Sequence, residues 1–247
     1  MFGAGRLMLA NSDPSLFDPY FNGVVLLLGF EQTLNDPSPA NSTVVNGQFS
    51  GGFSYQSSPA KFDTYSINLP RTVGYTYLDI TSTTSSYYFG TGDFTIETWV
   101  YTTGTVWQNA NACVMDIAQK PNGSQGGPSF FGLSTSTIGI VSAYKTAVYD
   151  NTAMGFVTSD VVLPWNTWNH IVTGRQGTTF YLGTNGTLKT AGTSSKNWFP
   201  YNVKIKQDYY NESQYPANFD EFRVTKGVWR YGTGTTYTVP TARFPRQ

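Results

Sequence analysis

The strongest alternation of apolar and polar positions in the chain covers residues 94–101. The preceding residues, 89–93, include two glycines and an aspartate, a composition typical of a turn. Within 94–101 the even positions are mostly apolar, whereas the odd positions carry two large aromatics, Trp99 and Tyr101, around a single carboxylate, Glu97. Because successive strand residues point to opposite faces, this pattern predicts a long strand of an antiparallel sheet, near the middle of a sandwich.

Shorter stretches of the same kind predict strands along most of the chain, and no segment has a convincing helical period or an internal repeat. Residues 24–30 are apolar on both faces, as in a strand that is covered on both sides. The other predicted strands are 43–49, 66–69, 75–80, 114–118, 130–133, 138–144, 154–158, 168–173, 179–182, 202–206 and 219–225. This density of short strands predicts an all-β protein, a two-sheet antiparallel β-sandwich of the jelly-roll type.

Two further features are predicted for the C-terminal part. In the strand at 219–225, strict alternation places the odd positions 219, 221 and 223 on one face and the even positions 220, 222 and 224 on the other. The segment 237–245 contains two prolines, so we expect it to cross the surface as an extended strap.

Charge and composition exclude some classes of function. Lys plus Arg and Asp plus Glu are each 15 among 247 residues, so the formal net charge is zero, and no basic run is present. This balance argues against a nucleic-acid partner. Aromatic residues make up 16% of the chain and charged residues only 12%, which indicates a polar, nearly uncharged surface suited to neutral sugars or to other proteins.

The sequence also bears on the cellular compartment. Cys113 is the only cysteine, so no internal disulfide can form, and we expect it to be a small buried residue in a protein that folds in a reducing cytoplasm. The apolar patch at 7–10 is too short for a signal peptide, and no segment approaches transmembrane length. Membrane insertion is therefore not expected.

Three ordered blocks, Gly90–Tyr101, Leu163–Val172 and Asp220–Gly227, carry a resemblance to a known family. The first contains the phrase Gly-Thr-Gly-Asp-Phe-Thr-Ile-Glu-x-Trp-Val-Tyr, and residues 26–36 add a similarity to the family's first strand and loop. Over residues 22–245 the chain resembles laminin-G-like members of the concanavalin A-like lectin/glucanase superfamily. The resemblance implies a concanavalin A-like sandwich in which the last core strand lies beside the first.

The family module does not require the first residues, so the chain is divided into an N-terminal arm, 1–21, and a sandwich with a C-terminal strap, 22–247. The arm contains Phe2, Leu7 and Leu9, which are poor residues to leave in water. We therefore expect the arm to dock on its own domain or on a partner subunit.

The superfamily includes glucanases, so catalysis has to be considered. The glucanase branch places two glutamates on one strand in a Glu-x-Asp-x-x-Glu pattern, which brings a pair of carboxylates together. The four glutamates here do not stand in this arrangement, and Glu97 has no second acid on its strand. We expect Glu97 to be a structural, hydrogen-bonded carboxylate, and we assign no catalytic residue.

No metal or cofactor site is assigned. The single histidine, His170, shares a predicted face with Trp168 and Val172, as expected for a buried sheet residue. One cysteine and one histidine exclude the usual zinc sites. Calcium, which many relatives hold with loop aspartates, stays open, although the candidates do not converge on a ligand set: Asp36, Asp116, Asp150, Asp160 and Asp208.

Two segments have the composition of a sugar-binding site, in which aromatic rings stack on the sugar and polar groups bind its hydroxyls. One is the predicted loop 207–215, with Asp208, Tyr209, Tyr210 and Asn211, and the other contains Trp198 and Tyr201. Equally, these aromatics could contact neighbouring subunits or cover the sheet.

The ending of the chain is similar to modules of bacteriophage virion proteins, through its phrases Thr-Lys-Gly-x-x-Arg-Tyr and Pro-x-x-x-Phe-Pro. The resemblance implies a non-catalytic virion protein, a capsid decoration or a tail-associated adhesin, assembled in the host cytoplasm. Its sandwich would face host-surface glycans, and its arm would contact other virion proteins or its own copies. The alternative is a free-standing, calcium-dependent lectin. An enzyme that depends on Glu97 is not expected.

Overall fold

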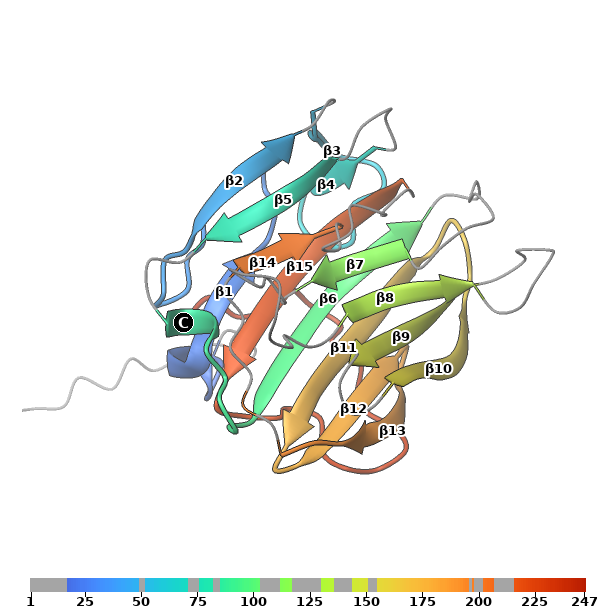
Figure 1. Cartoon of the computed structure of the whole chain (residues 1–247). Helices are drawn as coiled ribbons and strands as arrows, with labels where there is room; N and C mark the ends of the chain where they lie inside the picture. Colours follow the sequence, from blue (N-terminus) through green and yellow to red (C-terminus); the bar gives the residue numbers. More distant parts are fainter. Residues whose placement is uncertain are drawn as a thin grey trace, which may run out of the picture.

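The structure is a computed structural model, and the residues it describes are 17–48, 52–70, 76–81, 85–102, 112–116, 130–135, 144–150, 155–195, 197, 202–206 and 216–247. Within these ranges the chain forms two antiparallel sheets that face each other (Figure 1). The helical elements in the same ranges are two short 3-10 helices, η2 (Phe21–Gly23) and η3 (Ser85–Tyr87). The predicted all-β sandwich is therefore confirmed.

Sheet A contains the predicted central strand, β6 (Phe94–Thr102), at its middle. The order is β13-β12-β11-β6-β15-β4-β3, and β1 also pairs with β15. The first and last strands of the sandwich thus lie side by side, as the resemblance implied. The other strands of the sheet are β1 (Val24–Leu28), β3 (Ser54–Gln56), β4 (Ser66–Leu69), β11 (Trp168–Gln176), β12 (Thr179–Thr184), β13 (Thr187–Thr193) and β15 (Ala217–Lys226).

Sheet B has the order β10-β9-β8-β7-β14-β5-β2. Its strands are β2 (Thr43–Gln48), β5 (Thr76–Thr81), β7 (Ala112–Asp116), β8 (Phe130–Thr135), β9 (Tyr144–Asp150), β10 (Gly155–Leu163) and β14 (Asn202–Ile205). Most of these strands were predicted within a few residues. The strand predicted at 138–144 lies outside the described residues except for Tyr144, which begins β9. Strands β3 and β13, and β9 beyond Tyr144, were not predicted. The sequences of β3 and β13 are largely polar and lack a clear apolar alternation.

The main hydrophobic core lies between the two sheets. From β6 it receives Phe94, Ile96 and Val100, the apolar face predicted from the sequence, and from sheet B it receives residues such as Leu78 and Ile205. We call the side of sheet A that faces this core the inner face and the opposite side the outer face. Glu97 and Trp99 lie on the outer face, as the alternation predicted.

The strict alternation predicted for the last strand is wrong. The pairing of β15 with β6 shifts between Asp220 and Arg223, and Glu221 has a φ of 48°. This β-bulge places Asp220 opposite Trp99 and Arg223 opposite Glu97, so both side chains are on the outer face. Glu221 also contacts the strap on that side. The bulge thereby gathers three charged side chains of one strand on one face.

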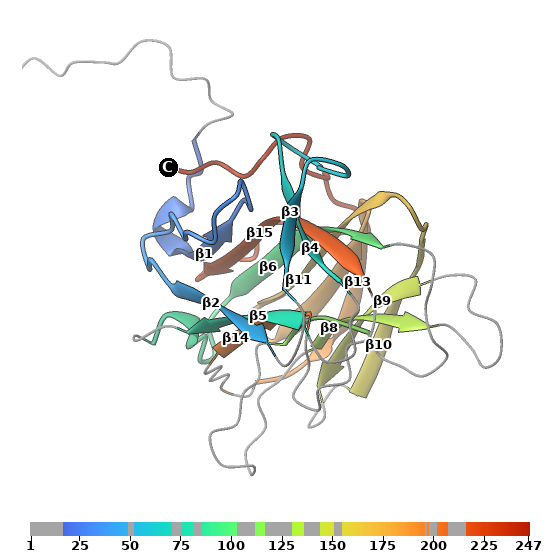
Figure 2. The same ribbon diagram turned by 90° about the horizontal axis from the view of Figure 1, so that it is seen from above.

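The C-terminal strap, residues 227–247, covers part of the outer face of sheet A (Figure 2). Trp229 and Tyr237 are buried against Val172, Tyr181 and Leu188 in a second apolar cluster. Closer to its end the strap inserts Phe244 against β1, beside Val24 and Leu27. The predicted strap, 237–245, lies within this longer segment, and the aromatic residues of the segment form part of the protein interior.

Glycines in the sheet make room for the strap. A Cβ atom at Gly174 would lie 2.6 Å from the ring of Trp229, and one at Gly183 would lie 2.8 Å from the ring of Tyr237. Side chains at these positions would therefore prevent the close contact between strap and sheet.

No helix within the described ranges is long and apolar enough to span a membrane.

Candidate functional site

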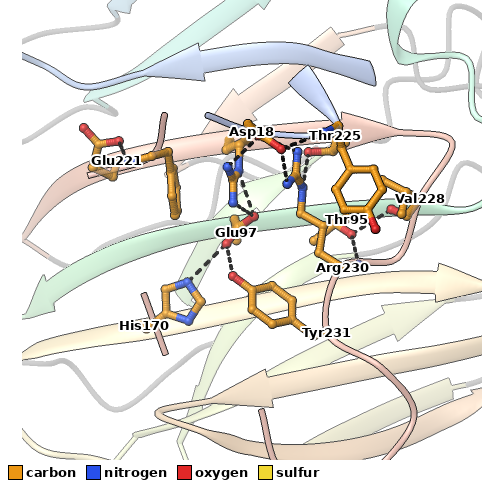
Figure 3. Close-up of polar contacts among 12 residues, drawn as sticks. Asp18, Thr95, Glu97, His170, Glu221, Thr225, Val228, Arg230 and Tyr231 are labelled. Carbon is orange, nitrogen blue, oxygen red and sulfur yellow. Dashed lines mark hydrogen bonds and ion pairs between the residues drawn. The ribbon is translucent and has the colours of Figure 1, made fainter. Parts of the chain in front are cut away.

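Glu97, at the centre of the outer face of sheet A, is the obvious candidate for a reactive carboxylate, yet it is completely buried. Figure 3 shows its polar contacts. Arg223 lies directly opposite on β15 and donates from Nε and Nη2 to Oε1 of Glu97, at 2.9 and 2.7 Å. The hydroxyl of Tyr231, from the strap, donates to the other oxygen, Oε2. The carboxylate is therefore held from both sides by hydrogen-bond donors.

A second carboxylate extends this network to the N-terminal side of the sandwich. Asp18 is 4% exposed and accepts from Nη1 of Arg223 at 3.1 Å. It also accepts two hydrogen bonds from the strap residue Arg230, at 2.9 and 2.8 Å. Glu97, Arg223, Asp18 and Arg230 thus form an alternating chain of two acids and two arginines. We call these four residues the buried charge network.

His170 borders the network and is also completely buried. Its Nε2 lies 3.4 Å from Oε2 of Glu97, too long for a strong hydrogen bond, and its Nδ1 lies 3.0 Å from the hydroxyl of Tyr237. A neutral imidazole that accepts from Tyr237 and turns its Nε2–H towards Glu97 fits both distances.

Electrostatics keep the carboxylate of Glu97 ionised. Burial alone raises the pKa of Glu97, but the attraction of Arg223, together with His170 and the Tyr231 hydroxyl, outweighs burial and lowers the pKa to about 2. Burial lowers the pKa of His170 more than Glu97 raises it, so the imidazole is neutral at pH 7. Burial and the nearby negative charge of Glu97 also raise the pKa of Tyr231 well above its ordinary value.

This arrangement suits a structural role. A general acid needs a proton to give at working pH and access to the substrate. Glu97 has neither, since its pKa is low and the strap covers it. The predictions that Glu97 is a hydrogen-bonded carboxylate and that His170 is a buried sheet residue are both confirmed.

Two more carboxylates lie further along β15. Asp220 is 1% exposed, and its Oδ2 accepts from the backbone N–H groups of Lys61 and Phe62 at 2.9 and 3.1 Å. Among the described residues, its Oδ1 has no hydrogen-bond partner. Burial raises the pKa of Asp220 to about 7, although the two backbone donors oppose this shift. Beside it, the Nζ of Lys61 lies 3.9 Å from the centre of the Trp99 ring.

The other described glutamates are also engaged in holding segments together. Glu31 accepts from the backbone N–H groups of Thr64 and Tyr65, at 3.2 and 3.0 Å. Glu221 accepts from the backbone N–H of Phe244 at 2.8 Å and pairs with Arg246. Glu212 lies outside the described residues.

The calcium candidates separate into one structural aspartate and four without a described side chain. Asp36 is 2% exposed and accepts hydrogen bonds from the backbone of Leu27, Ser38 and Ser42 and from the Ser38 hydroxyl, so it closes its own loop. Asp116 and Asp150 lie on β7 and β9, and Asp160 lies on β10. Across the described ranges, no group of three possible metal ligands is found.

The residues predicted to bind sugar are not described by the structure: Asp208, Tyr209, Tyr210, Asn211, Trp198 and Tyr201. Both segments adjoin β14. Tyr201 directly precedes Asn202, the first residue of β14, and Asp208 comes two residues after Lys206, which follows the strand. Lys206 is 2% exposed and donates from Nζ to the carbonyl of Pro70 at 2.7 Å. The two predicted segments therefore join β14 at its opposite ends.

Sequence reasoning missed Asp18 and Arg230, which complete the buried charge network. Asp18 was placed in the N-terminal arm, yet it is integrated into the sandwich; residues 1–16 lie outside the described residues. Asp18 and Arg230 are 212 positions apart. No local pattern connects two residues so far apart, so only the fold could reveal the pairing.

Fold and site together define a lectin-type β-sandwich. The central carboxylate of its sheet A, Glu97, is buried and paired with Arg223. A model of the concanavalin A-like lectin/glucanase superfamily, in its laminin-G-like form, matches residues 72–229, well over half of the sequence. The chain belongs to this superfamily. No curated protein sequence matches the chain.

Solved structures agree with this fold at low sequence identity. The binding domain of botulinum neurotoxin DC in complex with SialylT aligns with a TM-score of 0.59 and 13% identity, over 85% of this chain and 49% of that one. Domain 4 of AbnA, an extracellular arabinanase from Geobacillus stearothermophilus, solved with arabinotriose, aligns with a TM-score of 0.56 and 13% identity, over 87% of this chain and 94% of that one. The chain spans about half the length of the toxin binding domain and nearly all of the arabinanase domain.

Proposed function

We propose that the protein is a non-catalytic, lectin-like module of a bacteriophage virion, either a capsid decoration or a tail-associated adhesin. It presents its sandwich outwards and contacts glycans of the host surface. The N-terminal arm attaches it to other virion proteins or to its own copies. The virion context rests on the resemblance of the C-terminal phrases.

The observation that carries the proposal is the closed state of the outer face around Glu97. The superfamily includes glucanases, yet here the central carboxylate is buried under the strap and ion-paired to Arg223. A face built in this way supports a rigid binding module and does not present a reacting acid to a substrate. The arabinanase domain solved with arabinotriose and the toxin domain solved with SialylT support a glycan as the ligand class.

The anchoring of Asp18 supports an attachment role for the segment before it. Two arginines hold Asp18 in the sandwich, so a force on residues 1–16 would be passed to sheet A and to the strap. An arm that attaches the domain to a particle needs a firm connection to the sandwich, and the ion pairs of Asp18 provide one.

The attachment is tested by deletion of residues 1–16, which leaves Asp18 and its ion pairs in place. We expect the truncated protein to keep the unfolding midpoint of the full chain and to lose binding to virion particles assembled without the protein. If it still occupies those particles fully, the docking role is wrong.

Glycan contact is tested with an immobilised panel of bacterial surface oligosaccharides, with and without a calcium chelator. We expect binding that survives the chelator. Binding that the chelator abolishes would favour the calcium-dependent lectin instead, and the absence of binding to the whole panel would contradict the glycan part of the proposal.

A further inference from the structure

Beyond the strap, the outer face of sheet A carries a row of uncharged polar and aromatic residues. In strand register, Trp168 on β11 lies opposite Tyr101 on β6, and Tyr101 lies opposite Asn218 on β15. Asn218 lies opposite Asn68 on β4, and Asn68 lies opposite Ser54 on β3. We call these five residues the amide–aromatic row. It crosses five neighbouring strands near the end to which the β6 arrow points in Figure 1.

The row is on the outer face and reaches the solvent. Its neighbours along the strands, Val100, Phe219 and Ile67, lie in the core between the sheets, so the row must point the other way. Trp168, Tyr101 and Asn68 are half-buried, Ser54 is exposed, and Asn218 is buried beneath its neighbours. The two apolar clusters of the strap pack elsewhere, around Val172 and Tyr181 on β11 and β12 and beside Leu27 on β1.

Hydrogen bonds fix the amides in place and leave other polar groups available. Asn218 donates to Gln56 Oε1 at 3.2 Å and to Ser66 Oγ at 3.0 Å, and it accepts from Asn68 Nδ2 at 2.9 Å. Within the described part of the chain, Oδ1 of Asn68, Nε2 of Gln56 and the Tyr101 hydroxyl make no hydrogen bond. One end of the row therefore offers oriented donors and acceptors.

The other end offers aromatic surface. The rings of Tyr101 and Trp168 lie 5.6 Å apart with an angle of 59° between their planes. The indole N–H of Trp168 is buried and has no hydrogen-bond partner among the described residues, so Trp168 contributes its ring. Tilted rings beside fixed amides provide the two kinds of contact that a sugar needs, an apolar surface for its C–H face and partners for its hydroxyls.

We propose that the amide–aromatic row binds a neutral oligosaccharide laid across the strands of sheet A. The inference rests on the proposed glycan-binding function and names its site and ligand class. Neighbouring strands are separated by about 4.8 Å, so five strands give the row a length of about 19 Å, enough for several sugar units.

A neutral ligand fits because the row contains no charged side chain. The charged side chains closest to the row lie at the next pair of facing residues, Trp99 and Asp220, and both already have partners. Asp220 is buried and accepts from two backbone N–H groups, and Lys61 lies over Trp99. A sialylated, sulfated or uronate-containing glycan would find no cation in the row to compensate its charge.

The described residues also form a pocket outside the row. This pocket, of about 530 Å³, lies between Phe62 and the end of the strap and is lined by Asp63, Arg243 and Arg246. Asp63 and Arg243 form an ion pair at 2.8 Å across it. Because the pocket contains arginines, an acidic ligand would select it over the row.

The test measures binding of the full chain to matched immobilised glycans, neutral oligosaccharides of three or more hexose or deoxyhexose units and their sialylated or uronate-containing counterparts. We expect the neutral set to be bound in preference. Trp168→Ala and Asn68→Ala should each weaken that binding at least tenfold, with the unfolding midpoint measured for each variant. Tyr101→Phe, which removes only a hydroxyl, is a second variant if Trp168→Ala does not fold.

Three control variants separate the alternatives. Tyr88→Ala removes an aromatic that is 44% exposed near the opposite end of β6, and it should leave affinity unchanged. Trp198→Ala tests the segment predicted from sequence, and Arg243→Ala tests the pocket. If the chain binds glycans and the row variants keep full affinity, or if acidic glycans are preferred, the row is wrong while the glycan-binding function stands. If no glycan is bound, both fail.

Discussion

Two N–H groups of Arg223 converge on one oxygen of Glu97, across the pairing of β15 with β6. The two residues are 126 positions apart, and both side chains are buried. Because a one-residue slip of a strand turns every side chain to the opposite face, a slip here would bury two unpaired charges. The pair therefore fixes the register between the central strand and the last strand of the sandwich.

We expect Glu97→Gln to lower the free energy of unfolding by about 3–5 kcal/mol, because removing one partner leaves the other charge buried without compensation. Urea denaturation followed by tryptophan fluorescence would measure the loss. The double variant Glu97→Gln/Arg223→Met should recover part of it, since it removes both charges.

The matched control is Asp63→Asn, which breaks an ion pair with Arg243 that is largely exposed. Exposed pairs contribute about 0–1 kcal/mol, so this variant should unfold almost like the wild type. A cost of less than about 1 kcal/mol for Glu97→Gln would contradict the structural role assigned to the network.

How far the sequence predicts the fold depends on how local the determining pattern is. Strand β6 was predicted because its alternation is contained in consecutive residues, Phe94 to Tyr101, and both faces are as expected. Strand β13 was missed because Thr, Lys and Gly dominate it and only Leu188 and Ala191 are buried apolar residues. It forms because β12 supplies a pairing edge, which is a tertiary effect.

The bulge at Asp220 and Glu221 was not predictable from alternation. It depends on a left-handed backbone conformation at Glu221, which the residue type does not favour. The conformation is compensated by contacts from distant segments: the backbone N–H of Phe244 and the side chain of Arg246 both bind the Glu221 carboxylate. A residue pattern confined to one strand contains no information about these partners.

The candidate sites show the same division. Sequence reasoning assigned the correct structural roles to Glu97 and His170, because each was evaluated within its own strand. The amide–aromatic row was missed because Trp168, Tyr101, Asn218 and Asn68 come from four separate strands. Each is ordinary in its own segment, and only strand register aligns them.

A second prediction concerns Asp18. In Asp18→Asn the neutral amide cannot balance Arg223 and Arg230, whose side chains are 7% and 9% exposed. We expect a loss of about 2–4 kcal/mol in unfolding free energy. Amide hydrogen exchange should also become faster in residues 227–235, because Arg230 tethers this part of the strap to Asp18. Phe17→Ser is the matched control: Phe17 is 65% exposed, so neither quantity should change. Unaltered exchange in the strap of Asp18→Asn would show that the tether is unimportant.

A third prediction follows from the raised pKa of Asp220. Burial raises this pKa from the ordinary aspartate value of 3.8 to about 7 in the folded protein, so the folded state binds the proton more tightly than the unfolded chain does. Asp220 therefore contributes most favourably below about pH 4, and this contribution is lost as the pH rises towards 7. The unfolding free energy of Asp220→Asn, minus that of the wild type, should increase between pH 4 and pH 7 and then level off.

Taking this difference removes the background titration of other groups, including His170 and Glu97. Glu221 and Glu31 lie close enough to influence the pKa of Asp220, so the profile should be repeated in an Asp220→Asn/Glu221→Gln background and in Glu221→Gln alone. The plateau above pH 7 should persist in that comparison. A difference that is flat from pH 4 to pH 8 would mean that Asp220 titrates as an ordinary carboxylate.

The last prediction tests how closely the strap is packed on sheet A. A Cβ atom at Gly183 would lie 2.6 Å from Cγ1 of Val172 and 2.8 Å from the ring of Tyr237, closer than atoms in contact can approach. Gly183→Ala should therefore lower the unfolding free energy by about 1–3 kcal/mol, the usual cost of overpacking, and displace Tyr237 from His170. In Gly234→Ala the new atom would come no closer than 3.9 Å to its neighbours, so stability should stay within about 0.5 kcal/mol of the wild type. Thermal and urea unfolding would measure both variants. Equal stability would show that the strap can move away from the sheet at little cost in free energy. Burial of Glu97 under the strap would then be a weaker argument against access of a substrate to Glu97.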